Sequence, residues 1–451
     1  LTNPDFMDIH DGDYVKTAAG DDSVRALVGI GRDFWLQSQE AFPTLDRKIP
    51  ATLRKVGDKC MIFVADDQWV PYSEVDMFGT VYETNNIAAP IVPSEVEVVY
   101  NHFEAEDSVY FKINDIFAGG KEDAVPDMVN ILLVDVRDEY NLGRNDTNDS
   151  YWVGSFFNSN DQKTPDQVGE DVHTNNMDLI YIDTWPQLYS EEDSSWYWYE
   201  SGSTLEWRLN LPPGRTSSTN YTNIPVTVDN AIDNAYTKLL AYRVDKWESQ
   251  WMVEGFASLA EFLLEGEASF YGAGSPSTPT GNPLKNLSNG LKSRIDFFNT
   301  YLFMLYLYEK FDNDSLDMIK TLAVQPSVDM NSLNITFQRL VDAGAGNALL
   351  RQRWSEFDAE KIFSYYAAAC LLDTSNYNYA DSQTPGYDPV IASDDTMFNF
   401  RNVNLQNNIY TKNATAMKWD PVKGPPPYNF TQEEWSFSYF YSTFNPPALT
   451  N

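Results

Sequence analysis

Short apolar runs separated by polar turns dominate the first half of the chain. Two such runs in residues 51–70 flank Gly57-Asp58, which predicts a β-hairpin. Continuous apolar runs at residues 128–136 and 178–184 are bounded by polar residues. Short runs that are apolar at successive positions favour strands that are buried on both faces of a sheet.

The hydrophobic period becomes helical in the middle of the chain. One apolar stripe at helical spacing predicts a helix of about four turns, and its residues are Ile232, Tyr236, Leu239, Leu240 and Tyr242. A second helix is predicted from about Gln250 to Glu265. Residues Leu291–Phe311 are apolar on nearly all sides and predict a core helix. Two or three further helices are predicted within residues 333–372.

After Asp373 the chain becomes rich in Asn, Tyr, Asp and Pro, and a Pro-rich stretch at 423–428 precedes residues 435–444. This last segment has high β propensity, and the alternation of a strand would place its aromatic side chains on one face. These assembly candidates are Trp435, Phe437, Tyr439 and Tyr441. An exposed aromatic strand can pair with another chain, and the alternative is a strand packed within its own domain.

Together these patterns predict an α+β fold in three parts. Residues 1–125 are expected to form a small β-rich N-terminal domain. Residues 126–373 are expected to form a sheet followed by a helical body. Residues 374–451 are expected to form an irregular C-terminal extension, rich in Asn, Tyr and Pro, that ends in the aromatic strand.

The chain of 451 residues carries a formal net charge of −35, spread along its length. Nucleic acid is not expected as a partner, because phosphate binding needs a basic face. No membrane span is expected, since no apolar run reaches the roughly 18 residues required. Leu1 is not an initiator Met, which favours a mature secreted chain whose leader has been removed. We therefore expect an extracellular or cell-surface protein.

Sequons of the type Asn-x-Ser/Thr are compatible with an exported glycoprotein. Because the chain is rich in Asn, Ser and Thr, many such motifs arise by chance, so they are weak support for glycosylation. The candidate acceptors are Asn145, Asn148, Asn220, Asn286, Asn313, Asn334, Asn413 and Asn429.

The two cysteines, Cys60 and Cys370, lie in apolar segments. We interpret them as separate buried thiols, with a long-range disulfide as the alternative. If any metal is bound, the sequence favours calcium in the acidic loops flanking the central strand, with Asp135 and Asp138 as first candidates. The alternative there is a solvated acidic turn, and no other cofactor is expected.

Residues 249–261 read Ser-Gln-Trp-Met-Val-Glu-Gly-Phe-Ala-Ser-Leu-Ala-Glu. This Trp-x-x-Glu-Gly segment resembles the helix that supplies the third zinc ligand in hyicolysin-type metallopeptidases, secreted relatives of the thermolysin-like gluzincins. Further segments are similar to motifs of that family in the same order, so that the resemblance covers about residues 50–372. They are Val56–Val64, Asn130–Asp138, Asn175–Thr184 and Tyr301–Tyr308.

The resemblance implies a zinc site whose ligands are missing. Such enzymes need His-Glu-x-x-His on the preceding helix, which places two imidazoles on one helix face beside a general base. The corresponding stretch here puts Asn234 and Lys238 at the histidine positions and Ala235 at the position of the general base, whereas Glu254 keeps the third-ligand position. Neither an amide oxygen nor a charged ammonium replaces a zinc histidine.

The resemblance therefore implies a pseudopeptidase without zinc or catalytic residues, in which the ammonium of Lys238 takes the place of the metal beside Glu254. The chain has three histidines, and none lies near this stretch in sequence: His10, His102 and His173. The alternative is that residues 229–265 are two ordinary core helices that never held a metal.

Two functions are open to such a protein. The first, which we favour, is a structural or assembly subunit of the cell surface or of an extracellular filament or layer. Its expected partner is then another copy of the chain, in a homo-oligomer or polymer. The alternative is a non-catalytic module that binds a peptide or glycan in the peptidase cleft, where the aromatic residues Trp196–Tyr199 could stack on the ligand.

Overall fold

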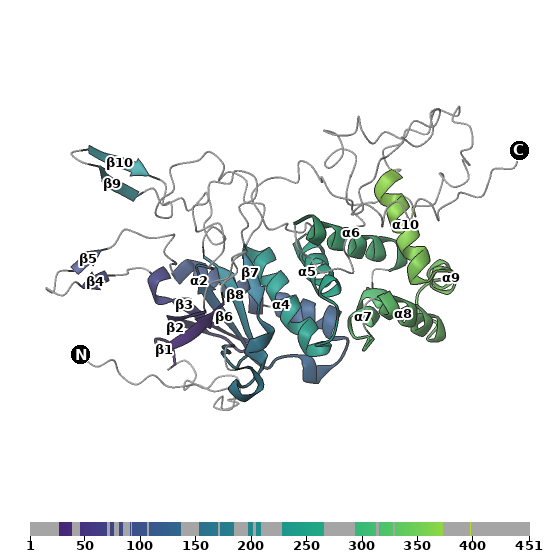
Figure 1. Ribbon diagram of the computed structural model, residues 1–451, viewed down its shortest axis with the longest axis horizontal. Coiled ribbons are helices and arrows are strands. Elements are labelled where there is room, and N and C mark those ends of the chain that lie inside the picture. The colour runs from purple at the N-terminus through teal and green to yellow at the C-terminus, as the bar shows by residue number, and fades with distance from the viewer. Residues whose placement is uncertain are drawn as a thin grey trace, which may run out of the picture. The chain divides into compact units, whose positions relative to one another are not determined.

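The structure is a computed structural model of residues 1–451 (Figure 1). The residues that it describes are 27–37, 46–69, 73–75, 81–83, 91, 93–105, 108–136, 153–169, 172–184, 197–201, 204–208, 228–265, 294–312, 315–327, 330–372 and 397. The chain divides into two compact units. Unit 1 comprises residues 1–246 and 260–273, and unit 2 comprises residues 247–259 and 274–451.

Unit 1 contains a six-stranded sheet with the strand order β1-β2-β3-β6-β8-β7. The strands β3, β6 and β8 run parallel to one another, and the remaining neighbours pair antiparallel. The strands are β1 (Gly31–Leu36), β2 (Arg47–Val56), β3 (Cys60–Ala65), β6 (Val129–Val134), β7 (Ser155–Phe157) and β8 (Leu179–Asp183). This mixed sheet and the helices that accompany it agree with the predicted α+β class.

The hydrophobic pattern locates the centre of this sheet correctly. The predicted hairpin is confirmed as β2 and β3, which are joined through Gly57-Asp58. The predicted buried strands are confirmed as β6 and β8, whose residues are all buried. Central parallel strands are covered on both faces, so successive side chains must be apolar, and this is why their runs are continuous rather than alternating.

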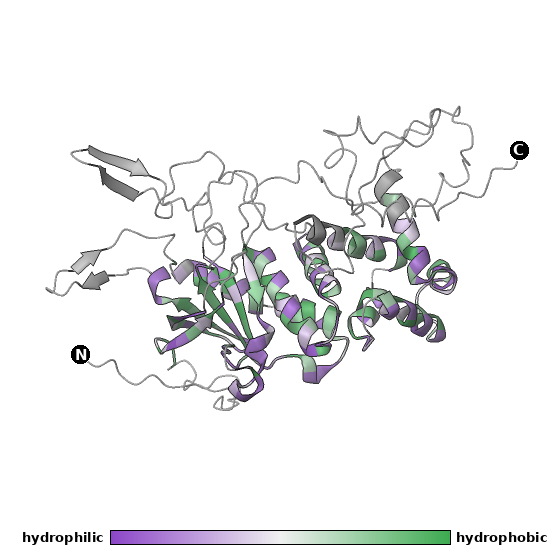
Figure 2. Cartoon of the chain, in the orientation of Figure 1, coloured by the Kyte–Doolittle hydropathy of each residue, from purple (hydrophilic) through white to green (hydrophobic). Residues whose placement is uncertain are grey.

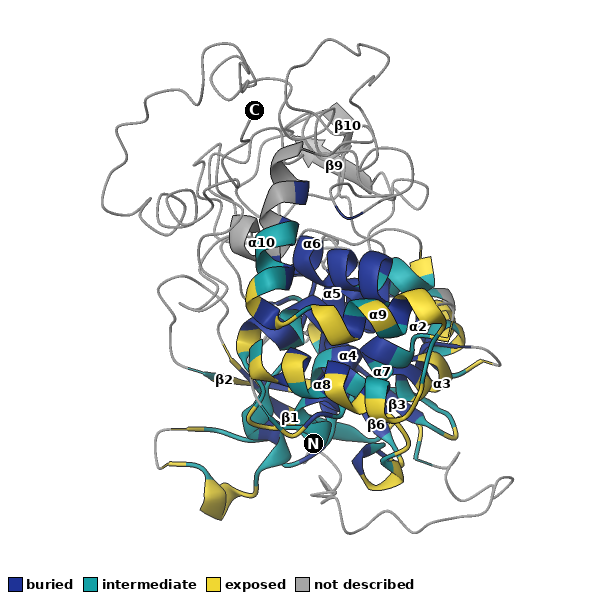
Figure 3. Ribbon diagram, turned by 90° about the vertical axis from the view of Figure 1, so that its right-hand side faces the viewer, coloured by how far each residue is buried: buried dark blue, intermediate teal, exposed yellow. Residues whose placement is uncertain are grey.

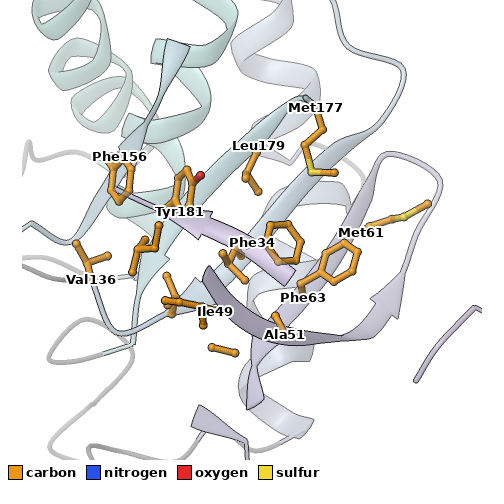
Figure 4. Packing of buried hydrophobic residues seen from close by; sticks show 14 of the residues in the cluster. Phe34, Ile49, Ala51, Met61, Phe63, Val136, Phe156, Met177, Leu179 and Tyr181 are labelled. Atoms are coloured by element: carbon orange, nitrogen blue, oxygen red, sulfur yellow. The ribbon is translucent and has the colours of Figure 1, made fainter. Parts of the chain in front are cut away.

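One face of the sheet holds a hydrophobic cluster to which all six strands contribute (Figure 4). Phe34 and Phe63 meet edge to face with ring centroids 5.0 Å apart, and Phe156 stacks on Tyr181 at 4.2 Å. Helices pack against the opposite face, where α2 (Pro93–Glu104) contacts β3 and α4 (Val228–Val244) contacts β7 and β8. The central strands β3, β6 and β8 are accordingly among the most hydrophobic elements in Figure 2.

Helix α4 is fixed to the sheet near its C-terminal end. Arg243 Nη1 donates to both carboxylate oxygens of Asp178, just before β8, at 2.9 Å each. Its Nε donates to the carbonyl oxygen of Ala124 at 2.7 Å. A planar guanidinium suits such forked contacts, so the orientation of α4 over β8 is set by polar geometry as well as by apolar packing.

The N-terminal region differs from the predicted β-rich domain at residues 1–125. It contains the helices α2 and α3 (Val109–Ile113), which the sequence analysis did not predict. Strands β3 and β6 pair with each other across the predicted boundary after residue 125. The predicted division of the chain into three segments stays a prediction. Two short hairpins complete the strands described, β4 (Ser73–Val75) with β5 (Val81–Glu83), and β9 (Tyr197–Ser201) with β10 (Thr204–Arg208).

Unit 2 is helical in its described part. The predicted core helix is confirmed as α6 (Arg294–Phe311), and its residues from Thr300 to Leu307 are buried (Figure 3). The predicted helices within 333–372 are confirmed as α8 (Met330–Asp342), α9 (Ala348–Glu356) and α10 (Ala359–Leu372). Helix α7 (Asp317–Ala323) was not predicted. Aromatic rings fill the interior, where Phe303 lies 5.0 Å from Tyr366 between centroids.

The predicted helix at 250–265 is confirmed as α5 (Gln250–Glu265), of which residues 250–259 count with unit 2 and the rest with unit 1. The predicted aromatic strand at 435–444 lies outside the described residues. Within the described part of the chain, no helix combines the length and apolar character needed to cross a membrane.

Candidate functional site

Helix α4 carries the positions that the resemblance assigns to a zinc site. Every side chain from Asn230 through Thr237 is buried, because the helix packs against the sheet and also against α2 and α3. Several of these buried residues are polar, among them Asp233 and Asn234. Polar groups placed where water cannot reach them need partners inside the protein.

Asn234, at the first histidine position of the resemblance, is 2% exposed, and its Nδ2 donates to Oε1 of Glu261 at 2.5 Å. Glu261 lies in the part of α5 that belongs to unit 1 and is fully buried. Ala235, at the general-base position, is fully buried and has no group that could activate water. The acidic partner of Asn234 is therefore Glu261, a residue that the sequence analysis did not single out.

The predicted pairing of Lys238 with Glu254 remains a prediction. Lys238 belongs to unit 1 and Glu254 to unit 2, and both are partly buried. Each takes part in an interaction, so neither is without a partner.

The Trp-x-x-Glu-Gly segment has a packing role within unit 2. Trp251 is buried, and its ring centroid lies 5.7 Å from that of Phe303 on α6. A Cβ atom added at Gly255 would lie 2.5 Å from Cγ of Met304 and 3.0 Å from Cγ2 of Thr300. Gly255 therefore permits a close approach of α5 and α6. This packing accounts for the Trp and the Gly of the motif without any metal.

A second polar group on α4 includes a residue of α2. His102, in the last turn of α2, has Nε2 2.9 Å from Oδ1 of Asp233 and Nδ1 3.5 Å from Oδ1 of Asp229. The two aspartates are one turn apart on α4 and share a helix face. Glu265, at the end of α5, joins them, since one potential ligand atom from each of His102, Asp233 and Glu265 lies within 4.8 Å of the other two. All four residues belong to unit 1.

Burial governs the electrostatics of this group. It raises the pKa of Asp233 to about 7, although the hydrogen bond and the positive charge of His102 act in the opposite direction. Burial alone would lower the pKa of His102, but the hydrogen bond to Asp233 and the charges of Asp233, Asp229 and Glu265 outweigh it, so that the net pKa of His102 is raised. The charged form of Asp233 is thus costly unless a cation lies beside it.

The hydrogen bonds of this group are incomplete. Asp233 is fully buried, and its Oδ1 contacts His102, but its Oδ2 has no hydrogen-bond partner among the residues that the structure describes. The group opens towards solvent on one side, because the His102 side chain is 17% exposed and that of Asp229 is 35% exposed. Glu265 is exposed. The buried oxygen of Asp233 therefore lies beside His102, Asp229 and Glu265, which are accessible to water.

Unit 1 contains a second buried carboxylate, Asp161, in the segment between β7 and β8. Its Oδ1 accepts the backbone N–H of Asn175 at 2.7 Å, and its Oδ2 accepts the hydroxyl of Tyr181 at 2.7 Å. The Asn175 amide pairs with both backbone groups of Trp35, with Oδ1 accepting at 2.8 Å and Nδ2 donating at 3.0 Å. Burial raises the pKa of Asp161 to about 7, against the effect of these hydrogen bonds.

Other predicted site residues have mixed outcomes. Cys60 is a buried free thiol, and burial together with the Glu104 carboxylate raises its pKa; the side chain of Cys370 is not described. Asp135 directly follows β6 and is partly buried. Asp138, the second residue predicted to bind calcium, lies outside the described residues. Seven of the eight sequons also lie outside them. The described sequon residue, Asn334, is exposed on α8 and accepts the backbone N–H of Ala359 at 2.8 Å.

Sequence reasoning located α4 and α5 but missed the group at His102. The one local signal was the spacing of Asp229 and Asp233, one helical turn apart on the helix that it predicted. Nothing in the local sequence links these residues to His102, which is more than a hundred positions away, or to the end of α5.

No protein-family model and no curated protein matches this chain. The likeness to hyicolysin-type peptidases therefore rests on the sequence motifs alone.

Proposed function

We propose that this chain is a catalytically inactive, metallopeptidase-like protein that serves as a structural or assembly subunit of the cell surface or of an extracellular filament or layer. One observation carries the loss of activity. At the first histidine position of the resemblance, the Asn234 amide is buried and is hydrogen-bonded to Glu261.

Peptide hydrolysis by zinc requires three protein ligands, an open coordination position for water and a general base. Asn234 offers a weak amide ligand whose amino group already donates to a carboxylate. Ala235 is buried and cannot take a proton. The packing of Trp251 and Gly255 against α6 also explains why the motif persists in a chain without peptidase chemistry.

The assembly role is supported by sequence features. A net charge of −35 suits an exported, solvated surface. The aromatic segment at 435–444 and the Pro-rich stretch before it suit pairing with a second copy of the chain.

A peptidase assay tests the first half of the proposal. The full chain is incubated with zinc and a broad peptide library, and an active gluzincin peptidase is run alongside it as a positive control. We expect no cleavage above the rate in buffer. Cleavage by the full chain that is lost in both Asn234→Ala and Glu254→Gln would contradict the proposal, because it would show that these positions still perform hydrolysis.

Negative-stain imaging and size-exclusion chromatography test the second half. We expect the full chain to form polymers or large homo-oligomers, and a chain that ends at residue 427 to remain smaller while keeping the far-UV circular dichroism of its folded part. A monodisperse full-length monomer that binds a peptide or glycan array would instead support the alternative role as a binding module.

A further inference from the structure

We propose that His102, Asp233 and Glu265 bind a divalent transition-metal ion, for which zinc is the best-suited candidate. The ion would tie α2, α4 and the end of α5 together within unit 1. This site differs from the peptidase-like positions, and the inference does not depend on the proposed function.

The three donors converge from separate helices. A ring nitrogen of His102 and one carboxylate oxygen each from Asp233 and Glu265 lie within 4.8 Å of one another. Zinc bonds of about 2.0–2.1 Å in tetrahedral geometry place neighbouring donor atoms roughly 3.3 Å apart. The observed separation of 2.9 Å between His102 Nε2 and Asp233 Oδ1 is therefore close to what a shared ion requires. Side-chain rotations that bring the Glu265 carboxylate from within 4.8 Å to about 3.3 Å of the other two donors would complete the site.

Asp229 supplies the support that a histidine ligand usually has. When an imidazole binds a metal through one nitrogen, its other N–H is held by a carboxylate or a carbonyl group, which fixes the ring and its tautomer. Here Nε2 of His102 faces Asp233, and Nδ1 faces Asp229 Oδ1 at 3.5 Å. The aspartates, one turn apart on α4, thus divide into a ligand and an orienting group.

The orphaned oxygen of Asp233 is an independent observation that points to a ligand. Asp233 is fully buried, and no residue in the described part of the chain donates a hydrogen bond to its Oδ2. A buried acceptor that lacks a donor destabilises the folded state. Hydrogen bonds within the group leave this cost in place, whereas a cation held by the same carboxylate would remove it.

The donor set selects the class of metal. Calcium and magnesium prefer oxygen ligands, and calcium takes six to eight of them. An imidazole nitrogen combined with carboxylate oxygens suits zinc and its first-row neighbours. Among the described residues, no other group brings three such side chains within the same distance.

Isothermal titration calorimetry with zinc on the metal-free full chain, with calcium titrated in parallel, tests the site. We expect one zinc per chain and no comparable calcium binding. His102→Gln should weaken zinc binding by about 100-fold or more, since it removes a ligand of the ion. The matched control is His173→Gln, because His173 also contacts an aspartate, Asp46, at 3.2 Å but belongs to no such group.

A variant of an exposed ligand separates the loss of zinc binding from misfolding, because substituting an exposed side chain leaves the core intact. Glu265 is exposed, so Glu265→Gln should fold normally and still lose zinc affinity, whereas the exposed Glu360→Gln should bind as the wild type does. The inference is overturned if the chain takes up no stoichiometric zinc, or if His102→Gln and Glu265→Gln bind zinc as tightly as the wild type. Zinc that is lost in Glu254→Gln but kept in Glu265→Gln would place the ion at the peptidase-like positions and would also contradict the site.

Discussion

Asp161 and Asp233 are two carboxyl groups of unit 1 that are buried to the same extent and titrate alike. Each is at most 1% exposed, and burial raises the pKa of each to about 7. Their surroundings differ. Both oxygens of Asp161 accept hydrogen bonds, from the Asn175 backbone and from the Tyr181 hydroxyl. Asp233 has one oxygen that is hydrogen-bonded to His102 and one to which no described residue donates.

This difference separates a structural carboxyl group from a binding one. The Asp161 network joins β1, the segment before β8 and β8 itself, and its donors and acceptors are matched. Such a network holds the sheet edge in place and leaves nothing for a ligand. The Asp233 group has a surplus of acceptors and a side open to solvent, which is the arrangement that a cation can complete. Burial and a shifted pKa alone do not distinguish the two roles.

The largest effect is expected from breaking the complete network at its centre. Asn175→Ala removes the amide that bonds Trp35 N, Trp35 O and the Tyr181 hydroxyl. We expect a loss of about 4 kcal/mol in the free energy of unfolding, because several partly buried polar groups lose their partners. Urea denaturation measures it. Asn160→Ala, which removes a contact with Lys163 at 2.8 Å, is the control and should cost less than about 1 kcal/mol.

The pH dependence of stability isolates Asp161. Its pKa in the folded state, about 7, lies above the ordinary value of 3.8, so the folded state binds the proton more tightly between these values. The stabilisation is complete below about pH 4 and is lost as pH rises towards 7. Asp161→Asn mimics the protonated form. We expect the unfolding free energy of the wild type to fall relative to this variant by about 2.5 kcal/mol between pH 5 and pH 7.5.

A constant difference between wild type and Asp161→Asn over that pH range would contradict the raised pKa. Denaturation at several pH values under the same ionic strength supplies the measurement, and groups that titrate equally in both proteins cancel in the comparison.

Tyr181→Phe turns the complete network into an incomplete one. It deletes the hydroxyl that donates to Asp161 Oδ2 at 2.7 Å, and leaves that oxygen in the condition of Asp233 Oδ2. We expect a loss of about 1–3 kcal/mol in stability. Tyr242→Phe, on the partly buried part of α4, is a control that should change stability less. An unchanged unfolding midpoint in Tyr181→Phe would show that Asp161 does not need this donor.

The smallest effect is expected for Asp233→Asn in metal-free buffer. The Asn side chain can still accept the hydrogen bond from His102, and the group loses an oxygen that had no hydrogen-bond partner. The change in unfolding free energy should stay within about 1 kcal/mol, because one unsatisfied polar atom replaces another. Chemical denaturation in the presence of a chelator measures it, and a loss as large as that of Asn175→Ala would remove the contrast between the two carboxyl groups.

The contrast between Asp161 and Asp233 also shows which features of the fold and the site could be predicted from the sequence. Continuous apolar runs predicted β6 and β8, helical spacing predicted α4, and a long segment that is apolar on nearly all sides predicted α6, because burial leaves a local pattern. Helix α2 was not predicted, although its buried residues Val96, Val99 and Phe103 follow helical spacing. The groups at Asp161 and Asp233 depend on contacts between distant segments, and such contacts leave no local pattern in a single sequence.

Thermal unfolding of three proteins with and without zinc tests the central claim most directly. The wild type and Asp161→Asn should both gain stability from saturating zinc, by about 2.7 kcal/mol at a free concentration of one hundred times Kd. Asp233→Asn should gain no stability from zinc, although it carries the same Asp-to-Asn substitution of a buried carboxyl group as Asp161→Asn. Equal stabilisation of all three proteins, or of none, would contradict the account.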